Sequence, residues 1–307
     1  MKVLIVGSTG LVGHALYRHL SSQPGFSVLG TSRADDLPGL ERLDVLEKGA
    51  FSGILEKTKP EVVLFPAAQP HVDACEQSPA ETRRLNVEAT LDAARSTLSS
   101  GARFVFFSTD YVFDGKTSGA YHEEDVPCPI NEYGRQKLDV EQALGGMDGS
   151  WLVLRVSAVF GWELNPRNFT LKVLSVLREG GQLRCAQDQV YNPTYAPSLA
   201  QAADRLISSG AEGIFHLAGP QTVSRYEFAR KAAEAFSLDG KRILGGRLSE
   251  LLGPGIAPRP LRTPLDSSRA RRLLGEGLMD VDEALSHMRA NEREWTAHSV
   301  SFKESRR

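Results

Sequence analysis

The feature that most constrains the fold is a regular alternation, in the first half of the chain, of short apolar runs with longer helical patterns. Five runs rich in Val, Leu and Phe are expected to form buried strands: Val3–Val6, Ser27–Leu29, Val62–Phe65, Phe104–Phe107 and Leu152–Leu154. Between them lie segments with apolar spacing near 3.6 residues: Leu11–Leu20, Ala50–Lys57, Ala80–Leu98 and Tyr133–Leu144. This alternation predicts an α/β protein with a doubly wound parallel (Rossmann) sheet that is covered by helices on both faces.

The second half of the chain is less regular and indicates a smaller C-terminal substrate-binding lobe. Helical and strand-like runs alternate there with Pro and Gly clusters such as Gly253–Gly255. We therefore expect a dinucleotide-binding domain formed by residues 1–156 with a returning segment, 190–217. The remaining segments, 157–189 and 218–307, are expected to form the lobe.

The charge and composition of the chain exclude several classes of partner. With 36 Lys and Arg against 38 Asp and Glu, the formal net charge is −2, which provides no footprint for nucleic acid or an anionic membrane. No apolar run approaches the roughly 20 residues needed to cross a bilayer. The three cysteines show no metal-binding or redox spacing, which fits a reducing compartment. We predict a cytoplasmic protein that binds a small molecule, with no metal, nucleic acid or membrane partner.

A glycine-rich loop follows the first predicted strand and begins the first helix. In Gly7-Ser-Thr-Gly10-Leu-Val-Gly13, the first glycine permits a sharp turn, the second permits close approach of a phosphate, and the third lets the helix pack on the strand. A helix N-terminus offers backbone N–H groups to a pyrophosphate. The residues predicted to bind a dinucleotide here are Gly7, Thr9, Gly10, Leu11, Val12 and Gly13. The alternative is a tight turn that binds nothing.

The end of the second strand indicates which dinucleotide is preferred. An NAD site places an acidic residue there to bind the ribose hydroxyl, whereas this chain has Ser32 and Arg33, which suit a 2′-phosphate. We therefore predict NADP, with NADPH preferred over NADH. Asp35 or Asp36 could instead pair with Arg33. After the next turn, Asp44-Val45 is predicted to border the adenine, and the alternative for Asp44 is an ordinary loop aspartate.

A threonine, a tyrosine and a lysine form a candidate catalytic set. Thr109 ends the fourth predicted strand, and Tyr133 and Lys137 are four residues apart on a predicted helix, so they share a face. An ammonium beside a phenol lowers the phenol's pKa from about 10. Such a tyrosine can protonate a carbonyl oxygen while hydride reaches the carbon, and Thr109 would hold the same oxygen.

On these motifs the chain resembles the extended short-chain dehydrogenases/reductases, and within them the dTDP-4-dehydrorhamnose reductase family of nucleotide-sugar 4-ketoreductases. The resemblance rests on Gly7–Gly13, Ala67-Ala68, Ser108–Gly115, Tyr133–Lys137, Asn192–Thr194 and Arg259-Pro260. It implies NADPH- or NADH-dependent reduction of the 4-keto group of a dTDP-linked deoxysugar, and a homodimer is common in the superfamily. It also implies catalytic roles for Thr109, Tyr133 and Lys137.

The resemblance adds residues to the predicted cofactor site and to the predicted substrate site. Ala67 and Ala68 join the residues expected to bind the cofactor. Asp110, Tyr111, Asn192 and Arg259 are expected to bind the substrate, although a surface ion pair is the alternative for Arg259.

Two departures from the family pattern leave the substrate open. Ala158 stands where the rhamnose-forming reductases carry a tryptophan, and Tyr191 stands where the family often has glycine. Tyr111, after Thr109-Asp110, disfavours a sugar dehydratase, which needs an acidic pair in this segment. Two alternatives remain: a non-catalytic NADP-binding subunit resembling the methionine adenosyltransferase β subunit, and a reductase of a non-nucleotide carbonyl compound.

Overall fold

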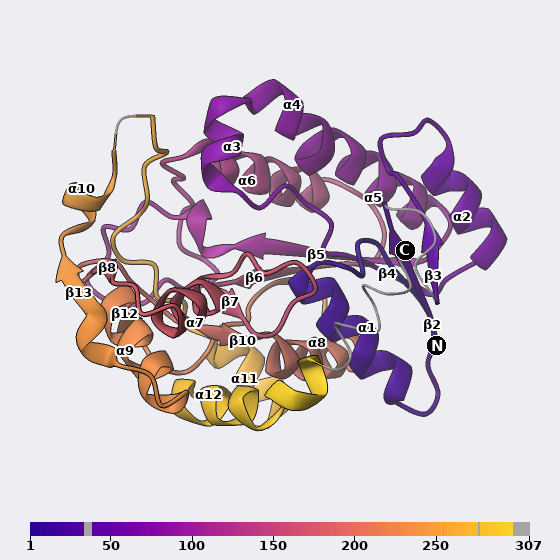
Figure 1. The fold of residues 1–307 in the computed structure, drawn as a ribbon. Coiled ribbons are helices and arrows are strands. Elements are labelled where there is room, and N and C mark those ends of the chain that lie inside the picture. The colour runs from indigo at the N-terminus through magenta and orange to yellow at the C-terminus, as the bar shows by residue number, and fades with distance from the viewer. Residues whose placement is uncertain (34–38, 254, 276, 297–307) are drawn as a thin grey trace.

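A parallel sheet of seven strands forms the centre of the molecule in the computed structural model (Figure 1), which describes residues 1–33, 39–253, 255–275 and 277–296. The strand order is β11-β6-β5-β4-β1-β2-β3, with parallel pairing throughout. The strands are β1 (Lys2–Ile5), β2 (Ser27–Ser32), β3 (Leu40–Arg42), β4 (Val62–Phe65), β5 (Arg103–Thr109), β6 (Trp151–Val156) and β11 (Gly213–His216). The predicted doubly wound sheet is confirmed. The three-residue β3 was not predicted.

The two faces of the sheet are buried by two separate sets of helices. Below it in Figure 1 lie α1 (Leu11–Ser22), α8 (Ala196–Ser208) and α11 (Ser268–Leu274), and above it lie α2 (Ala50–Thr58), α5 (Thr90–Ser99) and α6 (Glu132–Gly145). Successive side chains of a strand point to opposite faces. In β1, Val3 and Ile5 therefore enter one apolar core, and Leu4 enters the other. Each fully buried aliphatic side chain contributes about 1.5–3 kcal/mol, so the apolar runs stabilise both interfaces.

The segment predicted as one helix, Ala80–Leu98, is a broken helical path. It runs through α3 (Val72–Gln77), α4 (Pro79–Arg83), the π-helical turn η1 (Arg84–Ala89) and α5. The π turn widens the helix, and Asn86 lies buried within it. The Asn86 amide donates to the Gln136 side chain of α6 at 2.8 Å and to the Gln69 carbonyl at 3.2 Å, and the irregular turn thereby joins α6 to the loop after β4.

The smaller lobe is built on its own apolar core. Its longer elements are α7 (Phe169–Arg178), β8 (Leu183–Ala186), α9 (Arg225–Ala235), β13 (Ile243–Gly246) and α12 (Val281–Ala290). Its shorter elements are β7 (Val159–Phe160), β9 (Val190–Tyr191), β10 (Thr194–Tyr195), β12 (Val223–Ser224), η3 (Gly240–Arg242) and α10 (Leu248–Leu251). These pair as β8 with β13, β7 with β10, and β9 with β12.

The division between the domain and the lobe is less simple than the predicted boundaries. Within the returning segment 190–217, β9 pairs with β12 of the lobe, and only from α8 onward does the chain pack on the main sheet. Conversely, α11 belongs to the predicted lobe segment but packs against α8 and β11. The physical reason is burial: Ala270 and Leu278 lie in the same apolar core as the underside of the sheet.

None of the described helices combines the length and apolar character that crossing a membrane requires.

A buried ion pair ties four elements together beneath the carboxyl ends of the strands. Arg155 of β6 and Glu141 of α6 are bonded at 2.6 Å, and both side chains are 2 % exposed. Ser108 of β5 donates its hydroxyl to the same carboxylate. Arg155 also contacts the ring of His216 in β11 at 3.3 Å. Burial, and then the Arg155 charge, lower the pKa of His216 to about 3, so this histidine is a neutral partner.

We expect Arg155→Met to lower the free energy of unfolding by about 3–5 kcal/mol, because it leaves the buried Glu141 carboxylate without its cation. The measurement is denaturant unfolding of the purified protein. Arg155→Met/Glu141→Leu removes both charges and is expected to recover most of the loss. A double variant no more stable than the single one would show that the charge pair is not what Arg155 contributes.

Candidate active site

The glycine-rich loop has the backbone geometry that its sequence predicts. Gly7 has a φ of +91°, and a Cβ there would lie 3.1 Å from the Ala67 Cβ. A Cβ at Gly13 would lie 2.2 Å from the Gly7 carbonyl oxygen, so α1 packs too closely on the loop for any side chain. Gly10 precedes α1 and is exposed. The two outer glycines are therefore required by the fold, and the middle one leaves the helix terminus open.

Two hydroxyl groups hold this loop against β2. The Ser8 hydroxyl accepts the Thr31 N–H at 3.2 Å, and the Thr31 hydroxyl accepts the Gly7 N–H at 3.3 Å. The first turn of α1 carries no acidic residue, and Gly10 has no side chain that could cap it. Its N–H groups are thus presented to an anion by a rigid support.

The other predicted cofactor residues lie at the carboxyl ends of neighbouring strands. Arg33 is exposed at the end of β2, whereas Ser32 is only 2 % exposed. Asp44 accepts the Leu46 N–H at 3.0 Å and so stabilises its own turn. Asp35 and Asp36, the alternative partners of Arg33, lie outside the described residues.

Three further predicted cofactor residues are half-buried: Val45, Ala67 and Ala68. The first follows β3, and the two alanines follow β4, next to the glycine loop on the sheet.

The start of α6 brings Tyr133 to the end of β5. Asn131 caps the helix by accepting the Gly134 N–H at 2.9 Å. A Cβ at Gly134 would lie 2.1 Å from the Tyr111 carbonyl oxygen, so the helix packs directly on the turn η2 (Asp110–Val112), which follows Thr109. The rings of Tyr111 and Tyr133 consequently meet edge to face, with centroids 6.4 Å apart.

Lys137 lies one helical turn beyond Tyr133 and is buried. Its ammonium donates to the Phe107 carbonyl at 2.8 Å and lies 4.5 Å from the centroid of the Phe106 ring. It is 5.9 Å from the centroid of the Tyr133 ring. Burial lowers the pKa of Lys137 to about 8, and the charge of Glu141 opposes this change.

In the protein without its ligands, the pKa of Tyr133 is raised, so the expectation that Lys137 lowers it is wrong there. Burial raises the pKa of Tyr133 well above 10, and the charges of Cys75 and Asp110 act in the same direction. Hydrogen bonding with Thr109 opposes the increase but is the smaller effect. The phenol is therefore neutral at physiological pH, which is the state of a proton donor.

Asp110 binds three neighbouring hydroxyl groups and so stabilises the site. Its buried carboxylate accepts hydroxyl groups from Thr263 at 2.5 Å, Ser157 at 3.0 Å and Thr109 at 3.1 Å. Burial raises its pKa to about 6 despite these three donors. The side chain is 3 % exposed, so the structure gives it internal partners in place of the predicted contact with substrate.

Of the other predicted substrate residues, only Tyr111 lies beside the catalytic set. Its hydroxyl accepts from the Gln189 side chain at 3.4 Å. Asn192 is 4 % exposed, donates to the Gly219 carbonyl at 2.9 Å and accepts the Leu265 N–H at 2.8 Å, so it holds two loops of the lobe together.

Arg259 forms an ion pair, which is the alternative to substrate binding that the sequence left open. It is paired with Asp73 of α3 at 2.7 Å, and its guanidinium also donates to the Ala257 carbonyl at 2.6 Å. The Arg259 hydrogen bond lowers the pKa of Asp73. Its charge is therefore already used within the protein.

Sequence reasoning missed Glu141 and Gln189. Glu141 lies four residues after Lys137, so the helical spacing that joins Tyr133 to Lys137 could have identified it. Gln189 has no such signal, because its contact with Tyr111 joins residues far apart in the sequence.

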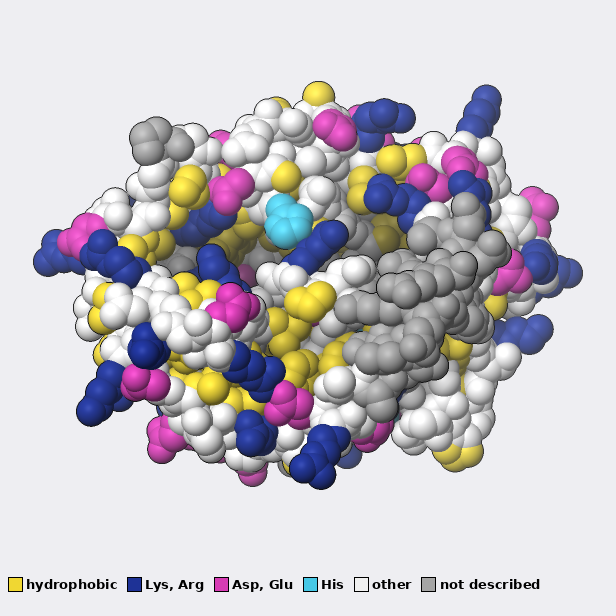
Figure 2. Space-filling model, viewed as in Figure 1, with side chains coloured by type: hydrophobic (Ala, Val, Ile, Leu, Met, Phe, Trp, Pro, Cys, Tyr) yellow, Lys and Arg dark blue, Asp and Glu magenta, His cyan; other side chains and the backbone are white. Residues whose placement is uncertain are grey.

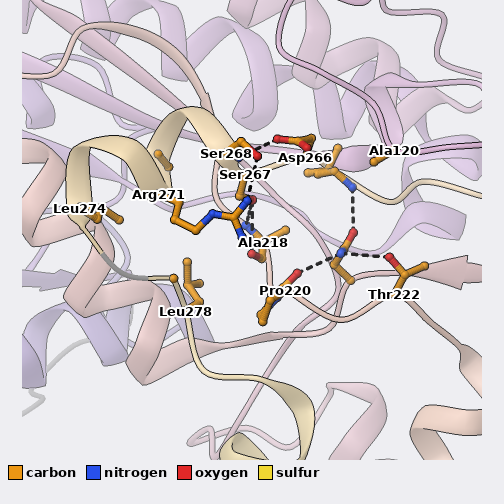
Figure 3. Close-up of a pocket in the computed structure, with 15 residues that line it drawn as sticks. Ala120, Ala218, Pro220, Thr222, Asp266, Ser267, Ser268, Arg271, Leu274 and Leu278 are labelled. Atoms are coloured by element: carbon orange, nitrogen blue, oxygen red, sulfur yellow. Dashed lines mark hydrogen bonds between the residues drawn. The ribbon is translucent and has the colours of Figure 1, made fainter.

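The same view drawn with all atoms (Figure 2) shows a hollow between the part around α3 and the part around α7, with apolar and basic side chains along it. A separate pocket of about 170 Å³ lies between α11 and the loop after β11 (Figure 3). Arg271 and Ser268 line one side of it, and Pro220 and Thr222 line the other. The catalytic set does not line this pocket.

No cluster of three His, Cys, Asp or Glu side chains suited to a metal occurs in the described part of the chain.

The sequence matches the RmlD substrate binding domain family over residues 1–293. It is 32 % identical over 297 residues to the probable low-salt glycan biosynthesis reductase of Haloferax volcanii, covering 94 % of this chain and 98 % of that protein. It is also 30 % identical over 279 residues to the methionine adenosyltransferase 2 subunit β of Pongo abelii, covering 89 % of this chain and 82 % of that protein.

Solved structures show the same architecture. The dTDP-4-dehydrorhamnose reductase of Clostridium acetobutylicum matches with a TM-score of 0.84 and 27 % identity, covering 94 % of this chain and 98 % of that one. The dTDP-4-dehydrorhamnose reductase of Bacillus anthracis, solved in complex with NADP, matches with a TM-score of 0.84 and 24 % identity over the same shares.

The raised pKa of Asp110 predicts how stability depends on pH. The unfolded chain loses this proton near pH 3.8 and the folded protein near pH 6, so the folded state binds more protons between these values. Raising the pH from about 4 to about 6 should therefore cost about 2 kcal/mol of stability at this residue. Urea unfolding of the wild type and Asp110→Asn across this range measures the effect, which the variant should lack.

Asp114→Asn is the matched control, because the pKa of Asp114 is lowered by the Tyr121 hydroxyl. It should leave the dependence between pH 4 and pH 6 unchanged. A wild type and an Asp110→Asn variant with parallel profiles would contradict the assignment.

Proposed function

This chain belongs to the RmlD substrate binding domain family, and we propose that it is an NADPH-dependent reductase of the 4-keto group of a nucleotide-linked deoxysugar. The observation that carries the proposal is the placement of Tyr133, a neutral and half-buried phenol, beside Thr109 and Lys137 at the carboxyl end of β5. The glycine loop follows β1, two strands away in the sheet. Strands are about 4.8 Å apart, so the two features lie within the length of one dinucleotide.

The residues around the loop fit a dinucleotide. Gly7 and Gly13 allow the tight packing of the loop, Gly10 leaves the helix terminus without a side chain, and the first turn of α1 offers N–H groups to a pyrophosphate. Arg33 offers a permanent cation to a 2′-phosphate. The reduced nicotinamide, when bound, supplies the hydride.

The chain's own residues manage the proton and the orientation. Thr109 turns its hydroxyl proton from Asp110 to the keto oxygen and holds that oxygen together with Tyr133. Tyr133 gives the oxygen its phenolic proton as the carbon is reduced. The product is an alcohol, and the phenol regains a proton from solvent. Lys137, anchored on the Phe107 carbonyl, stabilises the transient phenolate, whose formation burial would otherwise oppose.

We expect the sugar to lie near the turn between β6 and β7. Ala158, at the end of β6, is exposed and has a φ of +40°, a conformation that costs about 1–3 kcal/mol for a residue other than glycine. An alanine side chain at this wall would leave a wider pocket than the tryptophan of the rhamnose-forming reductases. The particular sugar and the homodimer implied by the family stay predictions.

A second candidate is a non-catalytic, NADP-binding regulatory subunit. The similarity to the methionine adenosyltransferase 2 subunit β of Pongo abelii favours it. The complete Thr109, Tyr133 and Lys137 set favours the enzyme. Binding of NADPH without turnover on any nucleotide-linked or free keto compound would favour the subunit.

Tyr133→Phe should lower kcat by about 10²–10⁴, because it removes the general acid while keeping the ring that packs on Tyr111. The measurement is NADPH oxidation at 340 nm with a panel of nucleotide-linked 4-keto-6-deoxysugars. Tyr226→Phe, the same chemical change in the lobe, serves as the control and should retain wild-type kcat. A Tyr133→Phe rate within about tenfold of wild type would contradict the proton-donor role.

Arg33→Ala should weaken NADPH binding by about 10- to 100-fold, since it removes a charged partner of the 2′-phosphate. NADH lacks that phosphate, so its dissociation constant should change less than about threefold. Fluorescence titration of both cofactors measures the difference. Equal losses for the two cofactors would exclude recognition of the 2′-phosphate by Arg33.

A further inference from the structure

Arg225, the first residue of α9, is a cation held in place by an aromatic ring. Its guanidinium carbon lies 3.8 Å from the centroid of the Phe169 ring, at the start of α7. Among the described residues, no carboxylate lies within ion-pair distance of it, unlike Arg259, which Asp73 neutralises. A stacked guanidinium keeps its N–H edges available for a planar bidentate contact.

The strand register places Arg225 opposite Gln189, which contacts Tyr111 beside the catalytic set. In the antiparallel pair of β9 and β12, Val223 is opposite Tyr191, and the Arg225 N–H donates to the Gln189 carbonyl at 2.9 Å. Residues that oppose each other in such a pair share a face. Arg225 therefore lies on the face of Gln189, whose side chain contacts the Tyr111 hydroxyl.

An isolated bridge continues this register toward the catalytic end of β5. Val190 pairs in parallel with Arg262, so Thr263 shares the face of Gln189. Thr263 donates to Asp110, directly after the catalytic Thr109. Arg262, on the opposite face, points away from this set.

The charge of Arg225 acts on the aromatic groups of this face. It opposes the increase in pKa that burial causes at Tyr111 and at Tyr191. Arg225 and Lys172 of α7 likewise both oppose the increase at the Cys185 thiol. Both cations are carried by helices that pack against each other, α7 and α9.

We propose that Arg225, supported by Phe169, binds the diphosphate of the nucleotide-linked substrate. The inference rests on the proposed function and replaces the predicted role of Arg259, because Arg259 is paired with Asp73 whereas no described carboxylate pairs with Arg225. A diphosphate carries the delocalised oxygens that a guanidinium fork matches. The ligand class is a nucleoside diphosphate, bound with its sugar toward Tyr133.

Arg225→Met tests the inference, since methionine keeps an apolar contact with Phe169 and removes the charge. The dissociation constant for dTDP or UDP should rise by about 10- to 100-fold in calorimetric titration, and KM for the keto sugar should rise similarly. We expect kcat and the dissociation constant for NADPH to stay within about threefold. Arg225→Lys, which keeps the charge without the fork, should lie between the two.

Arg262→Met is the matched control, because it removes a cation from the segment bridged to Val190, on the opposite face. It should leave nucleotide binding unchanged. Equal nucleotide affinity in wild type and Arg225→Met, or an equal loss in Arg262→Met, would overturn the inference.

Direct binding also separates this inference from the proposed function. A wild type that reduces keto sugars while Arg225→Met keeps its KM would leave the reductase standing and remove the diphosphate site. Binding of dTDP or UDP that depends on Arg225, without reduction of any sugar, would support the site and exclude the reductase. A wild type that neither binds these nucleotides nor reduces their sugars would overturn both.

Discussion

The contact between the first turn of α6 and the turn after β5 fixes the geometry on which the site depends. Gly134 allows that contact, since any Cβ there would lie 2.1 Å from the Tyr111 carbonyl oxygen. Asn131 starts the helix at this point and also donates to the Pro258 carbonyl at 3.0 Å, which joins the helix start to the lobe. Thr109 and Tyr133 are therefore positioned by backbone packing, and their approach does not rely on a flexible side chain.

Burial, more than charge pairing, determines the protonation of the catalytic groups. It raises the pKa of Tyr133 and lowers that of Lys137 to about 8, which is the direction expected when charged forms lose their hydration. The free protein is thus prepared as an acid, which suits reduction. Oxidation of an alcohol would need the phenolate, and any further stabilisation of that state has to come from groups brought in by the ligands.

The local parts of this site could be predicted from the sequence, and the long-range parts could not. The loop from Gly7 to Gly13 and the spacing of Tyr133 and Lys137 are set by neighbours in the chain, so periodicity and turn chemistry sufficed. The pairing of Arg259 with Asp73 joins residues 186 positions apart. The sequence likewise gives no signal of the internal role of Asn192, because its partners Gly219 and Leu265 lie in distant loops.

The segment 259–265, called the strap below, holds the lobe in register with the catalytic residues. The Arg259 guanidinium pairs with Asp73 of α3, Thr263 donates to the buried Asp110, and the Leu265 N–H donates to Asn192. These bonds connect the strap to the domain on one side and to the lobe on the other, and the last two are buried. Because the strap also pairs with β9, which carries Gln189 just before it, the lobe face that bears Arg225 is set relative to Tyr133 before any ligand binds. Because this cleft is formed before ligands bind, little binding free energy is lost in closing it. Selection among sugars therefore has to come from the side chains along its wall.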